Sequence, residues 1–195
     1  MYRKDRKKEF FTELAKKEGY PARSVYKLKE INEKFGIFKK GDNILDLGSA
    51  PGSWILYASK IVGNKGQVTG VDQEEIKIGK LPNVRFIKKS VFDLQESDFK
   101  EKFQSVISDL SPKTSGIKSV DSGRSLELVE KAFKTAEMFL APGGSFVCKV
   151  FESEQINSFV NKMKKYFESV KISKPKAVFK KSKEFYLVSK GFKKA

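Results

Sequence analysis

The chain has 195 residues, 39% of them apolar, so it can bury the core of one α/β domain without a second one. Its 40 lysines and arginines outnumber its 24 acids, and the net charge of +16 indicates either a polyanionic partner such as nucleic acid or a solvated, lysine-rich surface. The sequence has no histidine and a single cysteine, Cys148. This excludes histidine-dependent catalytic triads, a cysteine-histidine metal cluster and an intrachain disulfide.

The first 20 residues predict a basic extension. Residues 2–18 are rich in charge, and Phe10, Phe11 and Leu14 have the spacing of a short helix that lies on the main body. The charged start is not followed by the apolar segment of a leader peptide, and no run of about 18 apolar residues occurs in the sequence. We therefore expect a soluble cytoplasmic protein with a core domain over residues 21–191.

A second helix is predicted over residues 22–35. Val25, Leu28, Ile31 and Phe35 form one apolar face of this helix. Lys27 lies off that face, so periodicity alone predicts a lysine exposed to solvent.

The segment 43–54 predicts a strand that ends in a ligand-binding corner. A short apolar run is followed by small residues, which allow a tight turn and a helix that starts at Pro51. Gly48 and Gly52 let the backbone approach a ligand, and amides at the helix start can bind its polar groups. The spacing lacks the third glycine of a dinucleotide fingerprint and the Gly-Lys-Ser/Thr of a Walker loop, which disfavours both classes.

Two acids end predicted strands. Asp72 closes the strand 67–72, about 20 residues after the glycine corner, where a carboxylate is suited to bind two ribose hydroxyls; the alternative role is a helix cap. Asp109 closes the strand 105–109 at the edge where open α/β sheets bind ligands, although it is also suited to a turn before Pro112.

Lys149 lies within an apolar strand, where a buried ammonium needs water, a partner or a function. Sequence pattern alone favours a lysine that extends to solvent and a catalytic lysine equally. A further strand is predicted over 84–88. The remaining predicted elements are a polar loop over 114–124, helices over 124–140 and 153–167, and strands over 145–151, 170–175 and 184–189.

A series of motifs resembles, in the same order, the FtsJ/RrmJ family of S-adenosylmethionine-dependent RNA 2′-O-methyltransferases. Residues 46–54, Asp-Leu-Gly-Ser-Ala-Pro-Gly-Ser-Trp, are similar to D-L-G-x-A-P-G-G-W, and residues 23–30 to the helix R-[AS]-x-[FY]-K-L-x-E. Residues 108–116 are similar to S-D-[ML]-[AS]-P-x-x-[ST]-G, and residues 146–151 to F-V-x-K-x-[FL]. Residues 179–188 resemble R-x-x-S-x-E-x-Y-[LIV]-V, with lysines in place of arginine.

The resemblance covers residues 20–191 and implies a Rossmann-like sheet of seven mostly parallel strands, the last antiparallel, with helices on both faces. It implies S-adenosylmethionine as the cofactor and a catalytic tetrad formed by Lys27, Asp109, Lys149 and Glu184. Without the family pattern, Glu184 is an exposed acid at a strand start. Trp54 is expected to be exposed at the cofactor site. The implied cofactor contacts are Gly48, Ser49, Pro51, Gly52, Trp54, Asp72 and Asp109, with either Ser90 or Asp93 at the adenine.

The implied reaction is an attack of a ribose 2′-oxygen on the cofactor's methyl group, with Lys149 as the base or the group that steers the hydroxyl. Burial and the like charge of Lys27 favour the neutral form of this lysine, whereas Asp109 and Glu184 favour the ammonium form. The scheme requires no metal and no membrane.

Family analogy implies a monomer that acts on a uridine of large-subunit ribosomal RNA, on assembled or assembling particles. The expected RNA contacts are Arg23, Lys29, Lys180 and Lys181. One alternative is a tRNA ribose methyltransferase of the same family, and another is an RNA-binding ribosome assembly factor without catalysis. A nicotinamide dehydrogenase is a more distant alternative.

Overall fold

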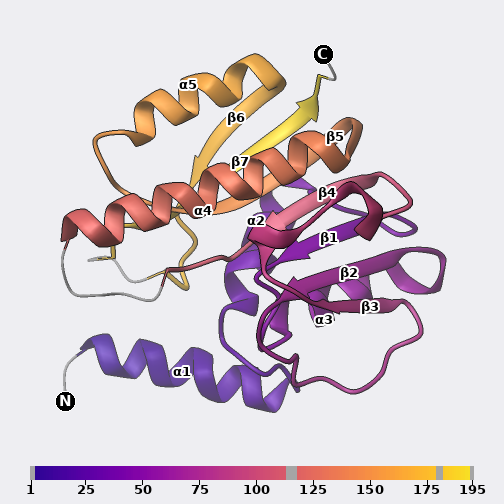
Figure 1. Cartoon of the computed structure of the whole chain (residues 1–195). Coiled ribbons are helices and arrows are strands. Elements are labelled where there is room, and N and C mark those ends of the chain that lie inside the picture. The colour runs from indigo at the N-terminus through magenta and orange to yellow at the C-terminus, as the bar shows by residue number, and fades with distance from the viewer. Residues whose placement is uncertain (1–2, 113–117, 179–181, 194–195) are drawn as a thin grey trace.

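Seven strands form one sheet in the order β3-β2-β1-β4-β5-β7-β6 (Figure 1). The computed structural model describes residues 3–112, 118–178 and 182–193. The strand β7 is antiparallel to both of its neighbours, and the other pairs are parallel. The strands are β1 (Asn43–Leu47), β2 (Gln67–Asp72), β3 (Val84–Lys88), β4 (Phe103–Ser108), β5 (Leu140–Phe151), β6 (Phe167–Ser173) and β7 (Glu184–Phe192).

Helices cover both faces of this sheet, which is why its central strands are apolar along almost their whole length. One core cluster joins α2 and α3 to the sheet, and a second joins α4 and α5 to its other face. The apolar stripe of α2 is buried through Val25, Leu28 and Ile31, as its spacing predicts. The helices are α1 (Arg3–Lys17), α2 (Val25–Phe35), α3 (Ser53–Val62), α4 (Lys118–Phe139) and α5 (Ile156–Tyr166).

This architecture confirms the expected sheet of seven mostly parallel strands with an antiparallel last strand. Because β1, β2, β4 and β5 run in parallel, their carboxyl ends meet at one edge of the sheet. The chain continues from β1 to β2 on one side and returns to β4 on the other, so the strand order reverses beside β1. Open α/β sheets bind ligands at such a point.

The helix α4 begins earlier than its periodicity predicts. A polar loop is expected over 114–124, but the backbone is helical from Lys118. Gly123 therefore lies within the helix, at a cost of about 1 kcal/mol relative to alanine. The prediction is wrong from residue 118 onward because a helical turn can form without apolar periodicity; residues 113–117 lie outside the described part.

The strands β5 and β7 are longer than expected. The preceding helix is predicted to end at residue 140 and the strand to begin at residue 145, yet β5 starts at Leu140, with an irregular register against β4. The strand β7 passes through Gly191, whose φ of +72° suits glycine, and pairs Phe192 with Phe167 of β6. Cross-strand pairing therefore extends both strands beyond their apolar runs.

Among the helices of the described residues, none is long and apolar enough to span a membrane.

Candidate active site

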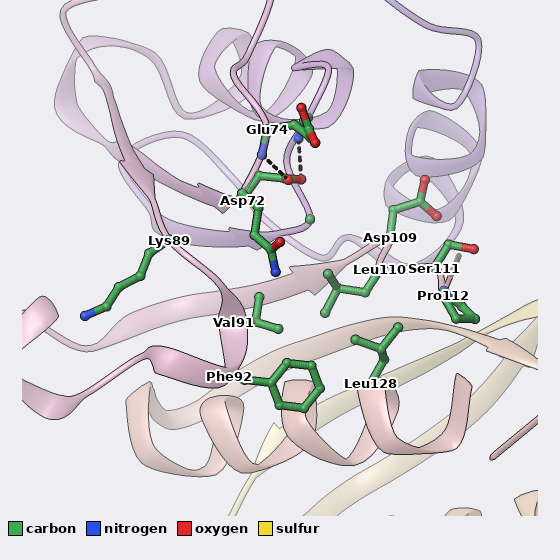
Figure 2. A pocket seen from close by; sticks show the side chains of 13 residues that line it. Asp72, Glu74, Lys89, Val91, Phe92, Asp109, Leu110, Ser111, Pro112 and Leu128 are labelled. Carbon is green, nitrogen blue, oxygen red and sulfur yellow. Dashed lines mark hydrogen bonds between the residues drawn. The ribbon is translucent and has the colours of Figure 1, made fainter. Parts of the chain in front are cut away.

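A cavity of about 570 Å³ lies at the carboxyl ends of β1, β2 and β4 (Figure 2). Small-molecule sites commonly have volumes of about 300–1,000 Å³. The cavity wall comes from the glycine corner, the end of β2, the segment after β3, the loop after β4, and α4. Three predicted cofactor contacts line it, namely Gly48, Asp72 and Asp109.

Asp72 is held in a fixed orientation at the end of β2. Its Oδ2 accepts a hydrogen bond from the Ala50 amide at 3.0 Å, and its Oδ1 accepts one from the Glu74 amide at 2.9 Å (Figure 2). Each carboxylate oxygen has more than one acceptor position, so both can still accept bonds from neighbouring hydroxyl groups. This geometry fits the predicted contact with a ribose.

The charge of the cavity wall is opposite to that of the whole molecule. Asp72, Glu74 and Asp109 are among its lining residues, and Asp109 is paired with Lys149. The lysine among its lining residues, Lys89, forms an ion pair with Asp98 at 2.8 Å. Because acids repel a polyphosphate and attract a cation, this wall favours a cationic ligand over a dinucleotide.

Apolar side chains form the opposite wall of the cavity. Figure 2 shows Val91, Phe92 and Leu128 on the side away from Asp72 and Glu74, with Leu110 next to Asp109. Phe92 is 45% exposed, which is unusual for so large an apolar side chain. A flat aromatic ligand placed against its ring would bury this surface.

The two candidates for the adenine contact flank this wall without lining the cavity. The Ser90 Oγ accepts a hydrogen bond from the Phe92 amide at 3.2 Å and so caps the short helix η2 (Val91–Asp93). Asp93 is exposed at the end of the same turn. Their role at the adenine stays a prediction.

The two glycines of the corner are required by its close contacts. Gly48 and Gly52 have φ values of +80° and +113°. A Cβ at Gly48 would lie 2.9 Å from Cδ2 of Leu110, and one at Gly52 would lie 2.8 Å from Cγ2 of Ile78. Glycine therefore lets the corner pack against the loops that follow β4 and β2.

The amides of the corner attach it to β2. The amides of Gly48 and Ser49 both donate to the Val71 carbonyl, at 2.9 and 3.3 Å. The Ser49 side chain is buried and Pro51 is half-buried, and neither lines the cavity. Their direct contact with a cofactor stays a prediction.

Trp54 is buried, and the expectation that it is exposed is wrong. Its side chain is 3% exposed, its Nε1 donates to the Ser24 carbonyl at 3.0 Å, and its ring centroid lies 5.8 Å from that of Tyr186. The indole therefore joins α3 to the start of α2 and to β7. It is outside the cavity lining.

Lys149 and Asp109 form a buried ion pair beside the cavity. Lys149 is 8% exposed, and its Nζ lies 3.2 Å from Oδ1 of Asp109. The same Nζ donates to the Asp109 backbone carbonyl at 2.6 Å. Asp109 thus supplies two partners for the buried ammonium group, one from its side chain and one from its backbone.

Lys27 and Glu184 form a second ion pair, with Nζ and Oε1 at 2.5 Å. Tyr186 links the two pairs, because its Oη lies 2.8 Å from Asp109 Oδ1 and 3.0 Å from Glu184 Oε1. Burial, followed by the charges of Asp109 and Glu184, raises the pKa of Tyr186 well above its usual value. Tyr186 therefore stays a neutral donor, and the structure brings all four residues of the implied tetrad together.

Asp46 is a buried acid close to both the cavity and the tetrad. It is fully buried on β1, in register with Gly70 of β2 and Ile107 of β4. Within the described residues, neither carboxylate oxygen has a hydrogen-bond partner. Burial, and then the negative charges of Asp109 and Asp72, raise the pKa of Asp46 well above its usual value. The protein environment therefore favours its neutral form.

The expected RNA contacts differ in their surroundings. The Lys29 ammonium is paired with Glu18 and lies over the Tyr20 ring, so a phosphate would have to displace an acid to bind it. Arg23 is half-buried in the turn before α2. Lys180 and Lys181 lie outside the described residues, and their role stays a prediction.

Sequence reasoning overlooked Asp46 and Tyr186, although each has a recognisable signal. Asp46 interrupts the apolar strand Ile-Leu-Asp-Leu, so the argument that singled out Lys149 applies to it as well. Tyr186 follows Glu184 by two residues, which places both side chains on the same face of a strand.

Known proteins are similar to this chain in sequence and in fold. A model of the FtsJ-like methyltransferase family matches residues 20–192. The chain belongs to this family. One relative, the ribosomal RNA large subunit methyltransferase E of Bdellovibrio bacteriovorus, is 47% identical over 180 residues, which are 89% of this chain and 91% of the relative. The resemblance drawn from the motifs is confirmed.

Solved structures share the fold of this chain. A ribosomal RNA methyltransferase of Plasmodium falciparum is 28% identical, with a TM-score of 0.76 over 89% of this FtsJ-like chain and 98% of the other. The fibrillarin of Aeropyrum pernix, solved with natively bound S-adenosylmethionine, has a TM-score of 0.55 over 77% of this chain and 67% of its own. At 17% identity the second likeness concerns the fold alone.

Proposed function

We propose that this FtsJ-like methyltransferase transfers a methyl group from S-adenosylmethionine to the ribose 2′-oxygen of a uridine in large-subunit ribosomal RNA. The observation that carries the proposal is the position of Asp109, which belongs both to the cavity wall and to the tetrad. A ligand in the cavity and a ribose at the tetrad would meet beside this residue. The relative named for large-subunit ribosomal RNA supports the substrate class.

The cavity residues fit S-adenosylmethionine. This cofactor is cationic, and the acids Asp72 and Glu74 of the cavity wall suit its charge. We assign its ribose to Asp72, and its adenine to the apolar wall around Phe92. When bound, the cofactor supplies an electrophilic methyl group, and its sulfur keeps the electron pair of the broken carbon–sulfur bond.

Lys149 orients the ribose hydroxyl and takes its proton. Its Nζ has two acceptors on Asp109, which use two of the three positions around the nitrogen. The third position is left for the 2′-oxygen, as an N–H donor in the ammonium form or as a lone pair in the amine form. The neutral amine accepts the hydroxyl proton as the oxygen bonds to the methyl carbon, and the resulting ammonium later releases that proton to water.

The other tetrad residues hold this geometry. The Lys27–Glu184 pair fixes α2 against β7, and Tyr186 ties Glu184 to the carboxylate that orients Lys149. All of these groups come from one copy of the chain, which supports action as a monomer. Residues 20–192, which match the family model, form the proposed catalytic domain, preceded by a basic extension.

Methyl transfer from labelled S-adenosylmethionine to large ribosomal subunits and to total tRNA tests the proposal. We expect label at a ribose 2′-oxygen of large-subunit RNA, and a loss of about a hundredfold or more in Lys149→Ala. The matched control is Lys171→Ala, which removes an exposed lysine on β6 and should keep full activity.

Each of the other possible outcomes would contradict a different part of the proposed function. Label in tRNA alone would replace the substrate. No label, with cofactor binding intact, would favour an RNA-binding assembly factor. Full single-turnover activity of Lys149→Arg at saturating cofactor would exclude Lys149 as the base.

A further inference from the structure

The segment between β6 and β7 is attached to α2 at two points. At its end, Glu184 pairs with Lys27 at 2.5 Å. Near its start, Oε2 of Glu30 accepts a hydrogen bond from the Lys176 backbone amide at 2.7 Å. Lys27 and Glu30 are three residues apart and therefore lie on the same side of α2. One helix thus holds both the tetrad and the chain that leads to it.

Apolar packing strengthens the attachment. Ala177 and Val178 are 4% and 5% exposed and belong to the same core cluster as Leu28 and Ile31 of α2. The Val178 amide donates to the Pro175 carbonyl at 2.9 Å, which closes a turn at this point. The start of the segment is therefore an ordered part of the molecule.

The ends of the segment are also bound to each other. Nζ of Lys174 donates to the Ser182 carbonyl at 2.6 Å, and Oγ of Ser182 accepts from the Glu184 amide at 3.1 Å. The Lys183 carbonyl accepts from the Glu152 amide after β5 at 2.9 Å. We define the basic loop as residues 174–178 and 182–183. The bond from Lys174 joins its two described parts, and Lys183 at its end is followed directly by Glu184 of the tetrad.

We propose that the basic loop binds phosphates of the RNA strand that flanks the target ribose, and that Glu30 is the positioning residue that sets its place. Lys174, Lys176 and Lys183 are exposed on this loop, and Lys183 directly precedes Glu184 of the tetrad. Phosphates next to a ribose held at the tetrad would therefore lie within reach of these lysines. The inference rests on the proposed function, since it concerns the RNA substrate of the same site.

The negative charge of Glu30 allows a positioning role to be distinguished from a purely electrostatic one. An acid beside a phosphate-binding surface repels RNA, so electrostatics alone predicts that its removal strengthens RNA binding. A positioning role predicts the opposite, because the lysines of the loop lose their fixed place when the bond to the Lys176 amide is lost. The two explanations therefore differ in the direction of the effect.

The test measures RNA binding and methyl transfer with large-subunit ribosomal RNA. For Glu30→Ala we expect the KM and the Kd for RNA to rise about tenfold. The slope of log Kd against log salt concentration should fall by about one, which corresponds to the loss of one phosphate contact. The value of kcat and the Kd for S-adenosylmethionine should change less than about twofold. Glu30→Gln keeps an oxygen acceptor and should restore RNA binding to within about twofold of the wild type.

Glu33→Ala is the matched control, since it removes an exposed acid from the same helix. If Glu30→Ala binds RNA as tightly as Glu33→Ala does, the inference is overturned. A loss of kcat without a change in RNA affinity would also overturn it, because Glu30 would then act through the tetrad. Failure of the wild type to methylate RNA would refute the proposed function, whereas RNA binding by the same variants would still test the loop.

Discussion

Several buried charged side chains lie near the carboxyl ends of the central strands. Lys149 and Asp109 neutralise each other, and the Tyr186 hydroxyl lies between two carboxylates. Asp46 differs, because within the described residues neither of its oxygens has a hydrogen-bond partner. An acid in this position weakens the fold when it is charged. A nearby cationic cofactor offsets that cost, which fits the proposed ligand.

The effect of Asp46 on stability should depend on pH. Burial and neighbouring carboxylates raise its pKa in the folded chain above the ordinary value of 3.8. Its contribution to stability is then fully present below that ordinary value and is lost as the pH rises through the raised folded pKa. Asp46→Asn carries no charge at any pH. The melting temperature of Asp46→Asn should therefore increase relative to that of the wild type as the pH rises from about 4 to about 8.

Thermal unfolding of both proteins, without cofactor, across this pH range measures the difference. The gain corresponds to about 1.4 kcal/mol for each pH unit, until the raised folded pKa is reached. A difference in melting temperature that is constant with pH would show that the pKa of Asp46 is not raised by folding.

Among the elements, α2 connects the most parts of the site. Its side chains bind Glu184 and the basic loop, and the Ser24 carbonyl at its start accepts the Trp54 indole of α3. The position of Lys27 thus depends on the packing of α3 and β7 as well as on its own helix. The helix α1 contributes Ala15 to the core cluster that joins α2 and α3 to the sheet.

Trp54→Phe should weaken the fold without weakening cofactor binding. The change removes the bond to the Ser24 carbonyl and should cost about 1–2 kcal/mol in the free energy of unfolding, measured with urea. Calorimetry should find the affinity for S-adenosylmethionine within about twofold of the wild type, because Trp54 is outside the cavity lining.

Tyr57→Phe on the same helix is the matched control. Its hydroxyl accepts a long bond of 3.4 Å from Asn32, so the expected loss is smaller, below about 0.5 kcal/mol. A large fall in cofactor affinity with unchanged stability in Trp54→Phe would instead support the direct cofactor contact that the motif implied.

At the scale of the whole molecule, the net charge of the chain and the charge of the cavity lining have opposite signs. The net charge is +16, yet acids line the cavity. A cationic cofactor and a polyanionic RNA therefore find surfaces of opposite sign on one small protein. The acids of the cavity would repel the phosphates of an RNA backbone.

Salt should affect the two ligands differently. If two to four phosphates are neutralised, the affinity for large-subunit RNA should fall by about tenfold to a hundredfold between 50 and 200 mM salt. The affinity for S-adenosylmethionine should change less than about threefold, because contacts inside a cavity are screened less. Filter binding for the RNA and calorimetry for the cofactor measure the two trends. Equal RNA affinity at both salt concentrations would contradict a phosphate-dominated interface.

The resemblance of the motifs to the family implied the four tetrad residues, and the sequence by itself determined the order of strands and helices along the chain and the glycine corner. These features depend on spacing within short segments, such as the apolar stripe of α2 or the period of two in β7. It also indicated that Lys149 needs partners, because a charge in an apolar strand is costly wherever the strand lies.

Only the tertiary structure decided which partners the polar groups find. Glu30 and Lys176 are 146 residues apart in the sequence, and Trp54 is buried because α2 and β7 pack around it. Lys29 is paired with Glu18, and Asp46 lies beside two other acids at the sheet edge. A local sequence pattern predicts which side of an element faces the core. The partners of the polar groups on that side depend on how distant elements pack.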